Sequence, residues 1–288
     1  MKKSKLAKVL TVSLAALMVF GLASCGGGSG KVSDKDITVI SREEGSGTRD
    51  AFTELTGVLQ DDVDKTVDTA EISNSTSVVI QSVAGNDAAI GYISLGSLDD
   101  TVKAVKVDGV EATVDNIKSG DYKIQRPFNI VTKGEVKELP ADFIKFIMSK
   151  DGQKIIEDEG YISVNENAEA YKASGLKGSI TLAGSTSVSP VMEVLADKYK
   201  ELNSGVTIEI QQTGSGAGIQ STTEGVCDIG MASRELKDEE TSQGLKSEEI
   251  ALDGIAVIVN KDNGAEDLSM DQIMKIFTGE ITNWADVK

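Results

Sequence analysis

Two stretches of this chain repeat one another at a distance of 139 positions. At this shift residues 45–48 (Gly-Ser-Gly-Thr) fall on residues 184–187 (Gly-Ser-Thr-Ser), and residues 75–76 fall on residues 214–215. In the same register residues 80–82 fall on 219–221, residues 90–91 fall on 229–230, and Ser94 falls on Ser233. Chance can produce one such match, but several in one register indicate two copies of one structural unit.

Each copy has the pattern of alternating strands and helices. The order is a strand, a Ser/Thr–Gly turn, a helix, a second strand, a second polar turn, a helix, and an Ile-Gly strand. Strands that alternate with helices indicate parallel βαβ units. The sequence therefore predicts two similar α/β lobes, with polar turns at the carboxyl ends of their strands facing each other across a cleft.

Apolar and β-branched patterning predicts the individual elements. Strands are expected at residues 37–40, 102–107, 129–132, 206–210, 228–234 and 250–259. Helices are expected at residues 49–55, 142–159, 188–202 and 270–277, the second of them as one long amphipathic helix. The polar residues 165–178 are expected to form a surface connection.

The turn at residues 41–48, Ser-Arg-Glu-Glu-Gly-Ser-Gly-Thr, concentrates hydrogen-bond donors. Gly45 and Gly47 permit backbone angles that direct several amides at one point. Ser46 and Thr48 add hydroxyls, the following helix adds its positive N-terminus, and Arg42 adds a planar guanidinium. Such a set suits an oxyanion. An ordinary strand-to-helix turn capped by Ser or Thr is an equally good interpretation of this stretch alone.

The N-terminal residues predict a lipoprotein leader. Residues 1–24 hold four lysines, no acid and an apolar stretch, and they end in Leu-Ala-Ser before Cys25. This resembles a bacterial lipobox, in which Cys25 becomes the lipidated first residue. Residues 25–31, rich in glycine, would then be a flexible tether to the membrane. The apolar run is too short to favour a transmembrane helix, and a plain secretory signal is the alternative.

Charge and residue content exclude several functions. Without the four leader lysines the chain has 25 basic and 46 acidic residues, so its surface should repel nucleic acid. Local backbone dipoles still permit a small anion as ligand. The chain has no histidine, which rules out a Ser-His-Asp relay, and no His/Cys cluster predicts a metal site. No phosphate-binding Gly-x-x-x-x-Gly-Lys-Ser/Thr motif is present.

Several segments together resemble the phosphate-binding protein of the high-affinity phosphate ABC importer. They are Ala-Gly-Ser-Thr-Ser at 183–187, Gly-Ser-Gly at 214–216, Asp-Ile-Gly at 228–230, Gly-Glu-Ile-Thr-Asn-Trp at 279–284 and Arg-Glu-Glu-Gly-Ser-Gly-Thr at 42–48. The resemblance implies a two-lobed α/β fold of the periplasmic-binding-protein type II class, with the ligand cleft between the lobes.

The order of these segments differs from the family's order. In the family the Gly-Ser-Thr segment comes first, and the Arg…Gly-Ser-Gly-Thr segment closely follows the Ile-Thr-Asn-Trp segment. This chain therefore looks like a circular permutant whose usual termini are joined through residues 163–179. A segment cut from a tandem array would have the same order.

The permutation implies how the lobes are assembled. Residues 130–258 would form a continuous lobe A, and residues 32–125 plus 262–288 would form a split lobe B. Residues 125–132 and 255–261 would be the two hinge crossovers. The C-terminal tail would then have to pack beside the first strand.

The resemblance also places the ligand contacts. Carried over residue by residue, they fall on Arg42, Ser46, Gly47, Thr48, Ser185, Thr186, Ser187, Ser215 and Ser233. Arg42 would make a bidentate contact and be held by a nearby acid such as Glu44. Many relatives have an aspartate where this chain has Ser233. A carboxylate there rejects a fully deprotonated anion, whereas a hydroxyl can donate or accept. Ser233 as a plain strand-end serine is an equal alternative.

The expected function is capture of inorganic phosphate outside the membrane and its delivery to the permease subunits of an ABC importer. The protein would be held at the cell membrane by its lipid, and it would be neither an enzyme nor dependent on a cofactor. The alternatives are a binding protein for a sulfate-like oxyanion, a phosphatase using Ser46 or Ser187, and a sensor or surface protein that has lost the ligand.

Overall fold

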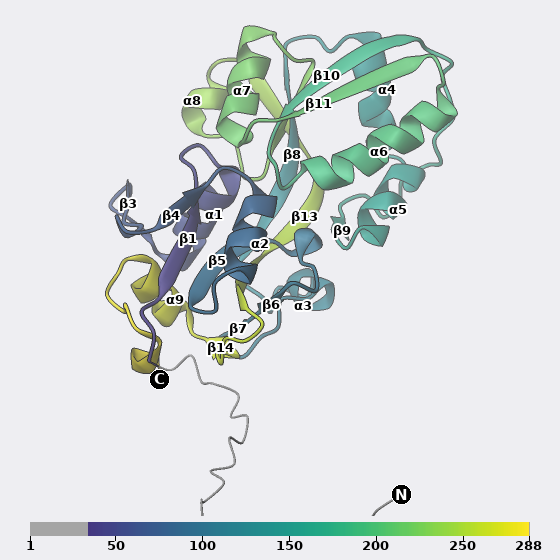
Figure 1. The fold of residues 1–288 in the computed structure, drawn as a ribbon. Coiled ribbons are helices and arrows are strands. Elements are labelled where there is room, and N and C mark those ends of the chain that lie inside the picture. Colours follow the sequence, from purple (N-terminus) through teal and green to yellow (C-terminus); the bar gives the residue numbers. More distant parts are fainter. Residues whose placement is uncertain (1–33, 288) are drawn as a thin grey trace, which may run out of the picture. The chain divides into compact units, whose positions relative to one another are not determined.

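The computed structural model of this chain describes residues 34–287 (Figure 1). The predicted leader at 1–24, the tether at 25–31 and the lipidation site at Cys25 lie outside the described residues. Among the residues described, none of the helices combines the length and the apolar character that a membrane crossing requires.

The described residues alternate strands and helices along most of their length. The strands are β1 (Thr38–Arg42), β2 (Leu59–Gln60), β3 (Val63–Asp64), β4 (Glu71–Ser73), β5 (Ala89–Ser94), β6 (Val102–Ala104), β7 (Lys106–Val107), β8 (Gln125–Lys133), β9 (Ile162–Ser163), β10 (Gly178–Gly184), β11 (Val206–Gln212), β12 (Ile229–Ala232), β13 (Leu245–Asn260) and β14 (Asp267–Leu268). The helices are α1 (Gly47–Thr56), α2 (Thr76–Ala84), α3 (Val114–Lys118), α4 (Glu138–Ile147), α5 (Lys150–Asp158), α6 (Ser189–Leu202), α7 (Ser215–Glu224), α8 (Asp238–Thr241) and α9 (Met270–Phe277). The described residues also form short 3₁₀ helices at Leu95–Ser97, after β5, and at Trp284–Asp286, after α9.

One continuous mixed sheet runs through the described chain in the order β11-β10-β12-β8-β13-β5-β1-β4. The strands at each end are parallel, as expected for βαβ units: β10 pairs with β11 and β12, and β1 pairs with β4 and β5. The long strands β8 and β13 join these two groups through antiparallel pairing (Figure 1). The first part of β13 pairs with β8, and its last part pairs with β5 and β6.

The two largest hydrophobic clusters of the described residues define two lobes, and two smaller clusters lie beside them. In the core that we call lobe B, Phe52 of α1 stacks on Tyr92 of β5 with ring centroids 4.0 Å apart, and Phe277 of α9 contacts both rings. In the core that we call lobe A, Phe143 of α4 contacts Tyr199 of α6. The fold is therefore a two-lobed α/β architecture, as the repeat predicts.

The last described residues pack against the first ones. The Ile37 amide donates to the Thr282 carbonyl at 2.8 Å, and the Trp284 amide donates to the Lys35 carbonyl at 3.0 Å. The buried Trp284 ring also donates from Nε1 to the Ala88 carbonyl at 2.9 Å. The C-terminal residues therefore complete lobe B beside the start of β1.

The prediction of one helix over residues 142–159 is wrong. The structure has two helices there, because α4 ends at Ile147 and Ser149 caps a new helix by accepting from the Gly152 amide at 3.3 Å. Both helices bury apolar side chains in the core of lobe A, which is why the apolar pattern continues across the break. By contrast, the predicted helix at 270–277 is confirmed, and the predicted helix at 188–202 begins one residue later than expected.

Candidate functional site

Buried hydroxyls from both lobes meet where the strands of the two lobes end. We call them the hydroxyl cluster: Thr48, Thr76, Ser185, Thr186, Ser187, Ser215 and Ser233. Each side chain is at most 5% exposed. Seven hydroxyls in one buried place require partners, and they find them largely in one another.

The centre of the cluster joins the two lobes directly. Thr48 Oγ1 of lobe B lies 2.9 Å from Ser187 Oγ of lobe A, and these two residues occupy equivalent positions in the repeat. Thr76 Oγ1 of lobe B lies 3.2 Å from Ser187 Oγ and 3.4 Å from Thr186 Oγ1. The two copies of the repeated turn therefore face each other with their hydroxyls in contact.

The other members of the hydroxyl cluster belong to lobe A, and two of them pack closely against the backbone of lobe B. Ser185 Oγ donates to Ser233 Oγ at 3.0 Å, and Ser215 Oγ accepts from the Ser233 amide at 3.2 Å. A Cβ added at Gly47 would lie 2.5 Å from Ser215 Oγ and 2.8 Å from Ser233 Oγ. Only glycine lets the lobe B turn approach so closely. The Gly216 amide also donates to the Gly45 carbonyl across the lobes, at 2.9 Å.

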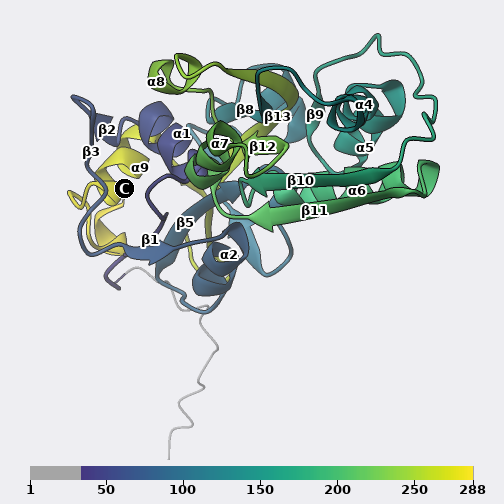
Figure 2. The same ribbon diagram turned by 90° about the horizontal axis from the view of Figure 1, so that it is seen from above.

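Four helices begin at this cluster. Helix α1 starts at Gly47, α2 at Thr76, α6 at Ser189 and α7 at Ser215. Figure 2 shows α1 and α7 close together in this region. A helix N-terminus carries a partial positive charge and unpaired amides, so four of them create a strongly favourable place for an anion.

Ser46 is buried beside the cluster, but its hydroxyl accepts from the Arg49 amide at 3.4 Å and so caps α1. The capping interpretation of this serine is therefore confirmed, and its predicted ligand contact remains a prediction.

Arg42 is buried and is held by a nearby acid, as expected, but this acid is Glu43 and not Glu44. Its guanidinium pairs with Glu43, from Nε to Oε2 and from Nη2 to Oε1, both at 2.8 Å, whereas Glu44 lies in the exposed turn. Nε also donates to the Ser73 carbonyl at 3.3 Å. Among the described residues, the contacts of this guanidinium are with Glu43 and Ser73 rather than with the hydroxyl cluster.

Thr76 is a cluster residue that the sequence analysis did not name. The signal was present, because the repeat places Thr76 on Ser215, which was named. The same reasoning fails for Ser94, the equivalent of Ser233. The Ser94 hydroxyl lies outside the hydroxyl cluster and donates to Asp253 Oδ1 at 2.9 Å.

A buried ion pair connects the two strands that pass between the lobes. Arg126 of β8 donates to Asp253 Oδ2 of β13 from Nε at 3.2 Å and from Nη2 at 3.1 Å, and both side chains are 1% exposed. Burial raises the pKa of Asp253 to about 6, against the opposing effect of Arg126 and Ser94. Arg126 Nη1 also donates to the Ser233 carbonyl, which links this pair to the cluster.

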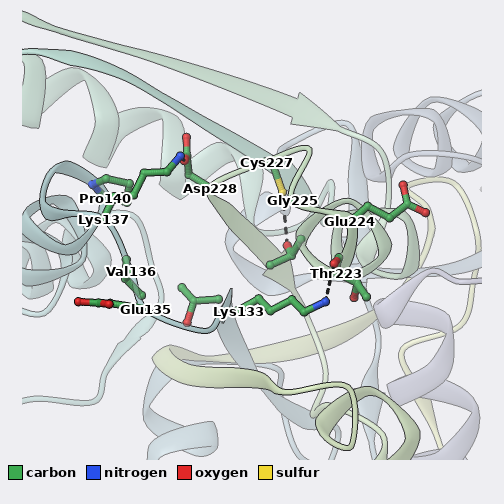
Figure 3. Close-up of a pocket in the computed structure, with 12 residues that line it drawn as sticks. Lys133, Glu135, Val136, Lys137, Pro140, Thr223, Glu224, Gly225, Cys227 and Asp228 are labelled. Carbon is green, nitrogen blue, oxygen red and sulfur yellow. Dashed lines mark hydrogen bonds and ion pairs between the residues drawn. The ribbon is translucent and has the colours of Figure 1, made fainter.

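A separate pocket of about 330 Å³ lies in lobe A, between the end of β8, the start of α4 and the end of α7 (Figure 3). Lys133 Nζ donates to the Thr223 carbonyl there, and Lys137 pairs with Asp228. Burial raises the pKa of the Cys227 thiol on its wall, which makes it a weak nucleophile. None of the predicted site residues lines this pocket. Over residues 34–287 no cluster of His, Cys, Asp or Glu forms a metal site.

Two α/β lobes that share two crossing strands and meet through buried polar turns define a two-lobed binding protein. A model described as the PBP superfamily domain matches residues 28–151 and 169–288. The phosphate-binding protein PstS 2 of Streptococcus agalactiae is 51% identical over 294 residues, which cover 100% of this chain and 99% of that protein. The chain therefore belongs to the PBP superfamily and, within it, to the family of the phosphate-binding protein PstS.

A solved structure and a more distant relative extend the comparison. The structure of a phosphate-binding protein of a phosphate ABC transporter from Streptococcus pneumoniae is 49% identical, with a TM-score of 0.71, and the match covers 88% of this chain and 100% of that chain. The phosphate-binding protein PstS of Bacillus subtilis is 37% identical over 128 residues, which cover 43% of each chain.

Substituting Gly47→Ala is expected to disturb the contact between the lobes. The new Cβ must displace the Ser215 and Ser233 hydroxyls, and overpacking of this kind costs about 1–3 kcal/mol of unfolding free energy. Gly264→Ala is the control, because no atom lies within 4 Å of a Cβ added there. Denaturant unfolding measures both variants. Equal unfolding free energies for the two variants would contradict the close approach at Gly47.

Proposed function

We propose that this protein binds inorganic phosphate outside the membrane and delivers it to an ABC importer. Its relatives are named as phosphate-binding proteins, one of them from a phosphate ABC transporter. The observation that carries the proposal for this chain is the hydroxyl cluster, in which donors from two lobes surround the N-termini of four helices.

A tetrahedral oxyanion suits this arrangement. Its oxygens accept hydrogen bonds in several directions at once, and the cluster offers hydroxyls and amides from both lobes. The anion would take the place of hydroxyl contacts such as the one between Thr48 and Ser187. Because donors come from both lobes, binding would favour the closed arrangement, with bending near Arg126 and Asp253 where β8 and β13 pass between the cores.

Arg42 is the basic side chain proposed to reach the anion. Arg42 donates to Glu43 from Nε and Nη2, so Nη1 is the guanidinium nitrogen that remains for the contact with the anion. Burial of the guanidinium would strengthen such a contact, because water competes less for the anion.

Phosphate is the first choice of ligand, and a sulfate-like anion is the second. The hydroxyl cluster consists of serines and threonines, and Ser233 stands where a carboxylate would reject a fully deprotonated anion. A hydroxyl can accept from a protonated phosphate oxygen or donate to a sulfate oxygen. Calorimetric titration with phosphate, sulfate and arsenate tests the choice, and absence of heat with phosphate would refute the proposal.

The competing class is a phosphatase that uses Ser46 or Ser187 as nucleophile. The chain has no histidine to act as its base, and the Ser46 hydroxyl is engaged in capping α1. Incubation of the purified protein with a phosphate ester separates the two functions. Stoichiometric binding without turnover supports the binding protein, and sustained turnover supports the phosphatase.

The location proposed for the protein is the outer side of the cell membrane, with Cys25 as the lipidated residue. Cells expressing the full chain and its Cys25→Ser variant would show whether the protein remains in the membrane fraction only when this cysteine is present.

Thr76→Val is expected to weaken phosphate binding by about tenfold or more. The substitution keeps the shape of the side chain and removes a hydroxyl that lies between the two lobes, and a hydrogen bond to a charged group contributes about 1.5–3 kcal/mol. Ser77→Ala is the matched control, since Ser77 is the next residue of α2 and is exposed. Calorimetry measures both, and an unchanged affinity for Thr76→Val would remove Thr76 from the site.

We also propose that the chain is circularly permuted relative to some members of the family, such as the Bacillus subtilis protein, whereas the Streptococcus agalactiae relative matches it in the same order over its full length. The match to the Bacillus subtilis relative covers less than half of either chain, as a comparison in sequence order gives when two segments have exchanged places. The family model likewise leaves residues 152–168 unmatched, next to the proposed junction at 163–179.

A chain with the order restored is therefore expected to fold and to bind. Its new ends would lie in residues 164–177, and a short linker would join residue 287 to residue 34, which is feasible because Trp284 contacts Lys35. We expect the rearranged chain to bind phosphate within about threefold of the original affinity, since the hydroxyl cluster is untouched. A chain that unfolds or does not bind would argue against the permutation.

A further inference from the structure

An ion-pair network joins the two lobes next to the hydroxyl cluster. Arg234 directly follows Ser233 in lobe A, and Asp50 lies in the first turn of α1 in lobe B. Arg234 Nε is 2.9 Å from Asp50 Oδ2, and Lys237 Nζ is 3.6 Å from the same oxygen. The Arg234–Asp50 contact is therefore a close ion pair between the two lobes.

Contacts within lobe A orient the Arg234 side chain toward the other lobe. Glu240 of α8 binds its Nη1 and Nη2 in a fork, both at 2.8 Å, and accepts from the Lys237 amide at 2.8 Å. Burial raises the pKa of Glu240, but the bonds from Arg234 and from the Lys237 amide outweigh it, and the pKa lies below its ordinary value. The carboxylate therefore keeps Arg234 charged and oriented toward Asp50.

The network borders a cavity, although its contacting atoms, Asp50 Oδ2 and Arg234 Nε, are themselves buried. This cavity has a volume of about 480 Å³, and residues of both lobes and of β8 line it, among them Asp50, Arg234, Lys237 and Gln125. Asp50 is 25% exposed, whereas Arg234 is 8% exposed. Salt therefore screens the exposed Lys237 and the outer part of Asp50, and it weakens the buried Asp50–Arg234 contact only in part.

The network is not part of the repeat. The shift of 139 positions places Asp50 on Ser189 and Leu95 on Arg234. Each charged residue therefore has an uncharged equivalent in the other copy. The network is an addition to one side of a nearly symmetric cleft, at the point where the chain has Ser233 in place of an acid.

We infer that Asp50 and Arg234 form an electrostatic latch that stabilises the closed lobes and thereby sets the affinity for the anion. Neither side chain has to touch the anion: both are positioning residues. This inference rests on the proposed binding function, because affinity is its first readout.

The sign of the effect distinguishes this latch from simple charge repulsion. Asp50 is a negative charge near an anion site on a chain of net charge −17, so removing it should by repulsion alone raise the affinity for phosphate. Loss of the latch has the opposite effect. We expect Asp50→Asn to weaken phosphate binding about tenfold at 20 mM NaCl, and by a smaller factor at 500 mM NaCl.

Glu54→Gln is the matched control. Glu54 lies one turn further along α1, lines the same cavity and is exposed. The substitution removes the same charge without affecting Arg234, so we expect an unchanged or slightly higher affinity. Equal effects of Asp50→Asn and Glu54→Gln, or a higher affinity in both, would overturn the latch.

Failure of the proposed function leaves the latch testable. If the protein binds no phosphate, small-angle scattering of the protein alone measures the separation of its lobes. A larger radius of gyration for Asp50→Asn than for Glu54→Gln at low salt supports the latch, and equal radii overturn it.

Discussion

The structure depends on how four helix N-termini are accommodated in one place. Their positive ends would repel one another unless oxygen atoms take up the charge, and the lobes can meet there only because serine and threonine hydroxyls lie between them. The two turns also require glycine, since any side chain at Gly47 would collide with Ser215. The same constraint explains the polar composition of the interface, and it makes a small anion a natural occupant.

The repeat predicted that its two turns face each other, and the structure brings them into contact. Thr48 and Ser187 are equivalent positions, and they contact each other. The same logic should have added Thr76, the equivalent of Ser215. This reasoning fails where the two copies differ. Ser94 donates to Asp253 of the crossing strand β13, and it therefore does not join the hydroxyl cluster.

The remaining errors concern side-chain direction and local competition. Sequence spacing did not distinguish Glu43 from Glu44 as the partner of Arg42, because the choice depends on how the turn after β1 orients each carboxylate. The helix at 142–159 was interrupted by a capping serine at 149, which the continuous apolar pattern concealed. Contacts between distant segments, such as Asp50 with Arg234, carry no local pattern at all.

The burial of the Cys227 thiol has a practical consequence. It is the one cysteine of the described part of the chain, it lies under the end of α7, and burial raises its pKa. A maleimide dye would therefore react first with any new cysteine placed on the surface. A fluorophore installed beside the hydroxyl cluster would report the proposed lobe movement as a change in emission, so the fold would serve as a scaffold for an optical anion sensor.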